Sequence, residues 1–189
     1  MKALSEFLKQ HAEKHQGKKE EFDRLREEWV QSIQRLMNQL QTWLREADPE
    51  HLLEAKQHFV EYNEEAIGHY TVPSLVIYLE GRRVQVVPQG RRVVGGILQV
   101  GNEFAGPSAA KVNDLRKQLG DSTLPPKQDN CRLWPVEGLV YITDGSERYR
   151  LYRMMDGQNE KWLIENEGGT RMTPLDRQTF EEAIVSLLE

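Results

Sequence analysis

Cysteine is almost absent from this chain of 189 residues, which contains only Cys131. A single cysteine cannot form an internal disulfide, so the fold is not built for an oxidising compartment. Long apolar runs are also missing, because none approaches the roughly 20 residues that a membrane-spanning helix needs. The first residues, from Met1 to Glu6, contain no apolar signal region. We therefore expect a cytoplasmic protein that makes no membrane contact.

Histidine does not occur beyond position 69, so a histidine-based catalytic arrangement in the second half would need a residue from the first. His11 and His15 have the spacing of a helical metal clamp. However, Glu13 is one place late for the general base of a metalloprotease, and we expect surface histidines. Net charge is −5, from 25 basic and 30 acidic residues. This mild acidic excess argues against a dedicated nucleic-acid or membrane coat.

The segment 101–108, Gly-Asn-Glu-Phe-Ala-Gly-Pro-Ser, matches both glycines and the serine of a phosphate-binding loop. Pro107 stands where that motif needs its lysine, and proline also lacks the backbone N–H that would hold a phosphate. Cys131 has Arg132 beside it, which favours a lowered thiol pKa, but a structural cysteine in a loop is the simpler interpretation. We expect no enzymatic activity, no cofactor and no metal site.

The first third of the sequence predicts helices. A weak helix over 3–15 is followed by Gly17 and a strong amphipathic helix over 18–46. Asp48-Pro49 then resembles a helix N-cap followed by proline at the first helical position, with apolar residues continuing at helical spacing to about Gly68. The short connection predicts an antiparallel, coiled-coil-like helical hairpin, which we assign to a domain of residues 1–70.

From Pro73 the apolar period changes to two, and glycine-containing turns separate short runs of β-branched residues. About six mainly antiparallel strands are expected, with a short internal helix over 109–119 and an amphipathic helix opening at Thr173-Pro174. The proline-containing segment 121–137 is expected to be a long loop. These elements form a second domain of residues 71–189, and the fold class is α+β.

An apolar stripe on the strong helix is the main candidate surface for a protein partner. It is wider than a two-stranded coiled-coil seam, and the second helix of the predicted hairpin is too short to cover it all. A protein partner or a second copy of the chain would then cover the remainder. The candidate partner-binding residues are Phe22, Trp29, Ile33, Leu36, Leu40 and Trp43.

Arginines on the predicted strands suggest a second hypothesis, in which the chain binds nucleic acid or an acidic protein. Arginine beside exposed aromatic side chains can contact phosphates and stack on bases. The alternative is an ordinary strand with one buried and one charged face. The candidate contacts are Arg82, Arg83, Arg91, Arg92, Arg148, Arg150 and Arg153. A non-enzymatic interaction or accessory module is the first hypothesis, and nucleic-acid binding is the alternative. A third hypothesis is an enzyme that uses the segment 101–108 or the loop 121–137.

Overall fold

The computed structural model describes residues 2–64, 67–91, 97–101, 131–156, 158–165 and 172–189. Two helices are described, α1 (Lys2–Ala47) and α3 (Arg177–Leu188). The strands are β1 (Glu54–Glu64), β2 (Gly68–Leu79), β3 (Arg82–Gly90), β4 (Ile97–Gly101), β5 (Cys131–Pro135), β6 (Gly138–Thr143), β7 (Arg148–Asp156), β8 (Asn159–Glu165) and β9 (Met172–Pro174).

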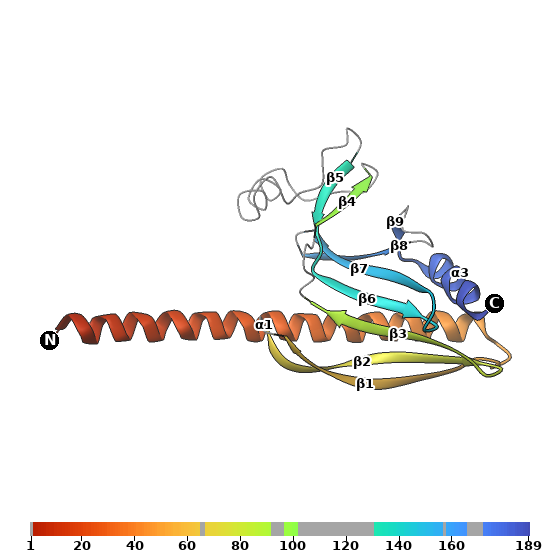
Figure 1. Ribbon diagram of the computed structural model, residues 1–189, viewed down its shortest axis with the longest axis horizontal. Coiled ribbons are helices and arrows are strands. Elements are labelled where there is room, and N and C mark those ends of the chain that lie inside the picture. The colour runs from red at the N-terminus through yellow and green to blue at the C-terminus, as the bar shows by residue number, and fades with distance from the viewer. Residues whose placement is uncertain (1, 65–66, 92–96, 102–130, 157, 166–171) are drawn as a thin grey trace.

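Seven of the strands form one antiparallel sheet in the order β1-β2-β3-β6-β7-β8-β9, while β4 and β5 pair separately. The second half of α1 lies across one face of the large sheet, and α3 packs beside the same helix (Figure 1). Apolar residues of α1, α3 and the sheet share one hydrophobic core. The predicted α+β class with an antiparallel sheet is confirmed.

The predicted helical hairpin is wrong. A single helix of 46 residues replaces it, and Gly17 lies within that helix rather than interrupting it. The segment that was predicted as the second helix folds mainly as β1 and pairs with β2 from Glu54↔Tyr78 to Glu64↔Gly68. As a result, β1 belongs to the segment 1–70 but forms the edge of the large sheet, whose other strands lie within residues 68–174.

The reason lies in the turn after α1. Asp48 does not cap a new helix; instead its carboxylate accepts hydrogen bonds from the backbone N–H groups of Leu52 (2.9 Å) and Leu53 (2.7 Å). His51 adopts a positive φ of 57°, which reverses the chain direction. The strand that follows contains Phe59, Val60 and Tyr62, whose aromatic and β-branched side chains favour a pleated sheet over a helix.

The C-terminal helix begins later than predicted. Thr173 and Pro174 belong to β9, and the helix is capped by Asp176, whose side chain accepts from the Thr179 backbone N–H at 2.8 Å. Residues 131–135 of the predicted long loop form β5. The rest of that loop up to 130, together with the predicted helix over 109–119, lies outside the described residues. Within the described ranges, no helix is both long enough and apolar enough to cross a membrane.

Candidate functional site

The structure places most of the predicted partner-binding stripe inside the protein's own core. Trp29, Ile33, Leu36 and Leu40 are buried against the sheet. Trp43 is only partly buried and packs against Phe180 of α3, with ring centroids 5.9 Å apart. Phe22 lies outside the core and is 41% exposed. The stripe therefore divides into a covered part after Leu25 and an uncovered part before it.

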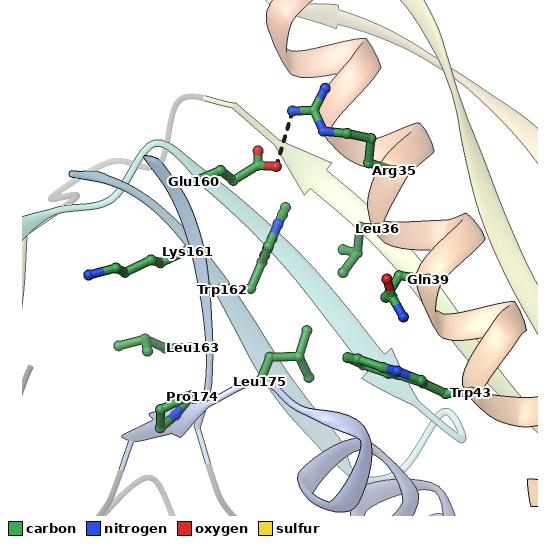
Figure 2. A pocket seen from close by; sticks show the side chains of 10 residues that line it. All are labelled: Arg35, Leu36, Gln39, Trp43, Glu160, Lys161, Trp162, Leu163, Pro174 and Leu175. Carbon is green, nitrogen blue, oxygen red and sulfur yellow. Dashed lines mark hydrogen bonds and ion pairs between the residues drawn. The ribbon is translucent and has the colours of Figure 1, made fainter. Parts of the chain in front are cut away.

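An open groove of about 830 Å³ runs along one flank of the covered part of α1. Figure 2 shows α1 as one wall, and β8 with the segment around β9 as the other. The apolar lining consists of Leu36, Trp43, Trp162, Leu163, Pro174 and Leu175. The polar lining consists of Arg35, Gln39, Glu160 and Lys161. An apolar floor with a charged rim is typical of a site that receives the apolar face of another segment.

One end of the groove is held by a charged network. Glu160 of β8 accepts hydrogen bonds from Arg35 (3.1 Å), from Ser32, and from Arg153 (2.6 Å). Burial opposes ionisation of Glu160, but the hydrogen bonds from Ser32 and Arg153 outweigh burial and lower the pKa of this carboxyl group. The wall of the groove is therefore fixed by an ionised carboxylate that joins α1 to the sheet.

Arg153 is the centre of this network. Its side chain is fully buried and also donates to Glu28 of α1 at 2.8 Å. Burial disfavours the charged form, but hydrogen bonds from Arg153 to Glu160 and Glu28 prevail, so the pKa of Arg153 is raised. Because an uncompensated buried charge costs several kcal/mol, these carboxylates and Arg153 hold each other in place.

A second contact fixes the opposite flank of α1. The Trp29 indole N–H donates to the Tyr70 hydroxyl at 3.2 Å, and that hydroxyl donates to Glu64. Burial and the neighbouring carboxylate of Glu64 raise the pKa of Tyr70. At Gly138, an added Cβ would lie 2.2 Å from the Trp29 ring, so only glycine permits this approach. The helix is thus fixed both in rotation and in distance from the sheet.

The predicted arginine contacts do not form one patch among the described residues. Arg82 and Arg83 are exposed beside the β2–β3 turn, whereas Arg91 forms an ion pair with Glu137 at 3.5 Å. Arg153 points toward α1, and the alternation of a strand places Arg148 and Arg150 on the opposite face.

On that opposite face, Arg148 lies 5.1 Å from the centroid of the Tyr141 ring. Arg150 donates to Glu165 at 2.8 Å, and the hydroxyl of Tyr152 donates to the same oxygen at 3.0 Å. Burial, together with the charge of Glu165, raises the pKa of Tyr152 to about 12. Arg92 lies outside the described residues.

The other candidate segments from the sequence lie largely outside the described residues. Gly101 ends β4, and the rest of the segment 101–108 lies outside the described ranges. Cys131 begins β5, opposite Gly101. Over the described residues, no group of three or more histidine, cysteine, aspartate or glutamate side chains is arranged to hold a metal ion.

Comparisons with protein-family models, with curated proteins and with solved structures find no match. The groove therefore has to be interpreted from its own residues. The sequence pointed to Leu36 and Trp43 but not to the opposite wall, because Trp162 and Leu175 are distant in sequence and only the fold brings them beside α1.

Proposed function

We propose that this chain is a non-enzymatic protein-interaction module, and that its groove receives an amphipathic helix of a protein partner. The supporting observation is the groove itself, in which apolar side chains from α1, β8 and the β9 segment face an open space. The single cysteine is consistent with a partner in the cytoplasm.

The shape of the groove favours a helix over an extended peptide. Its α1 wall is lined at positions 35, 36, 39 and 43, which lie along one side of a helix over about two turns. A second helix packs against such a ridge at an interaxial distance of about 8–10 Å. The edge strand β9 has three residues, which gives an added peptide strand little backbone to pair with.

The test is binding by a groove variant. Gln39→Arg places a long charged side chain in the groove from an exposed helical position, and it retains a residue with good helix propensity. The matched control is Asn38→Arg, at an exposed position that faces Gln57 of β1 rather than the groove. Each tagged protein is incubated with nuclease-treated extract of the native host, and co-purifying proteins are identified by mass spectrometry.

We expect a stoichiometric protein that binds the native chain and the control but is lost from Gln39→Arg. Equal recovery with all three proteins would contradict a role for the groove. Binding that disappears with nuclease treatment would instead favour the nucleic-acid alternative. If a copy of the chain itself is recovered, the partner is a second copy.

A further inference from the structure

The first half of α1 extends beyond the sheet as an arm (Figure 1). At the start of the packed half, Leu25 packs against the core, and Arg26 donates to the Ile67 carbonyl at 3.3 Å. Residues 17–22 are exposed, and Figure 1 shows the N-terminal part of the helix extending well beyond the sheet. The arm comprises residues 2–24, or about 35 Å at 1.5 Å per residue.

We propose that the helix received by the groove is the arm of a second copy of this chain, which makes the protein a two-fold symmetric dimer. This inference rests on the proposed function of the groove and names its occupant. The two α1 helices lie side by side and antiparallel, and the arm of each copy occupies the groove of the other.

The position of the groove along α1 sets the register of this arrangement. The α1 wall of the groove spans positions 35–43, and the apolar residues near the end of the arm are Leu4, Phe7 and Leu8, so the two come level when a two-fold axis lies beside residue 23. A two-fold axis near the middle of α1 therefore places each arm along the packed half of the other helix. With the axis beside Asp23, residues 3–8 of one copy lie level with residues 38–43 of the other, within the span of the groove.

In this register, the apolar residues of the arm come level with the groove of the other copy. The sequence places Leu4, Phe7 and Leu8 near the N-terminal end, whereas residues 9–21 are almost entirely polar. Leu4 is 65% exposed in the single chain, although it is a large apolar residue at helical spacing from Leu8. An apolar end on a polar arm is suited to an apolar groove at one defined distance along the helix.

The charges near the axis are complementary in the same arrangement. Lys18 and Glu28 are each five residues from Asp23, so Lys18 of one copy lies level with Glu28 of the other. Glu21 of one copy lies within one residue of the level of Arg24 in the other. By symmetry each pairing occurs twice, which favours the antiparallel orientation at this register.

The test is the molar mass of the purified full-length chain, measured by light scattering over a concentration series. One chain has a mass of 22.0 kDa, and we expect twice that value. Leu4→Glu combined with Phe7→Glu should give the single-chain mass, because it places two charges in the groove. The control Glu27→Arg, on the side of α1 away from the groove, should remain dimeric.

Exchanging the charges of Glu21 and Arg24 separates loss of the dimer from loss of folding, because the combined variant should recover. Glu21→Arg alone and Arg24→Glu alone should each raise the dissociation constant of the dimer several-fold, and the combination of both should restore it. A single-chain mass for the native protein at every concentration overturns the proposal, as does a dimer that resists the double change at the end of the arm. A single chain that still captures another protein through Gln39 overturns only the dimer, and the proposed function of the groove stands.

Discussion

At the scale of single residues, a few buried polar side chains fix α1 on the sheet. Arg153 is fully buried, yet it is surrounded by carboxylates from α1 and β8, notably Glu28 and Glu160. Such a cluster adds little net stability compared with apolar packing, but it penalises any other placement of the helix. The position of α1, and with it the α1 wall of the groove, is therefore sensitive to the charge of Glu160.

The lowered pKa of Glu160 predicts an acid-dependent loss of stability. A carboxyl group whose pKa is lower in the folded state contributes stability above its ordinary value of 4.5, and this contribution is lost as pH falls through the folded value. Glu160→Gln should lower the free energy of unfolding by about 1–3 kcal/mol at neutral pH, because Arg153 loses a charged partner. Urea denaturation from pH 7 to pH 3 should show the difference from the native protein shrinking below pH 4.5.

The control for this measurement is Glu46→Gln. Glu46 pairs with Arg177 at 2.9 Å, but both side chains are about half exposed, so solvent screens the pair. We expect no measurable change in the free energy of unfolding. A constant difference between native protein and Glu160→Gln across the pH range would show that the charge of Glu160 is not the cause.

At the scale of elements, the long helix was only partly predictable. The heptad spacing of Phe22, Trp29, Leu36 and Trp43 identified its strong part, and that period persists because one side of the helix packs on a sheet. Gly17 was taken as an interruption because glycine costs about 1 kcal/mol relative to alanine in a helix. A long helix tolerates one such residue, and nothing lies within 4 Å of the position of an added Cβ.

Replacing Gly17 with alanine should therefore stabilise the arm. No neighbour opposes the added methyl group, and alanine has less conformational freedom to lose, so the helix should gain roughly 0.5–1 kcal/mol. Far-UV circular dichroism during heating should show greater helix content at intermediate temperatures. Gly81→Ala is the matched control, since its surroundings are equally open but its φ is +89°, and it should destabilise the protein. Reduced helix content in Gly17→Ala would indicate that the arm does not stay helical through this position.

The strand β1 was missed for a physical reason. Ala55, Phe59 and Tyr62 recur at helical spacing, yet Phe59 is 69% exposed and contributes little to the core. What decides the structure is β2, whose residues from Val72 to Ile77 are all buried and whose outer edge needs a pairing strand. Such long-range pairing leaves little trace in local periodicity, whereas turns such as Asp144-Gly145 were identifiable from their residue types.

At the scale of the whole molecule, the groove and the arm belong to opposite halves of one helix. The sequence indicates an apolar helical surface that needs a cover, but it does not divide that surface into the part covered by the chain's own sheet and the part that extends beyond the sheet. That division depends on where the sheet ends along α1, near Leu25 and Arg26. This boundary separates the arm from the half of α1 that packs on the sheet.

A site-specific cross-link tests most directly the proposed antiparallel pairing of two copies about an axis beside Asp23. Cys131 is replaced by serine, and Phe22→Cys is introduced one residue from the proposed axis. A short bismaleimide should then yield a covalent dimer in high proportion. Gln31→Cys serves as control, since the two copies of residue 31 would be about 24 Å apart along the helix axis. Equal cross-linking at both positions, or none at position 22, would contradict the antiparallel dimer.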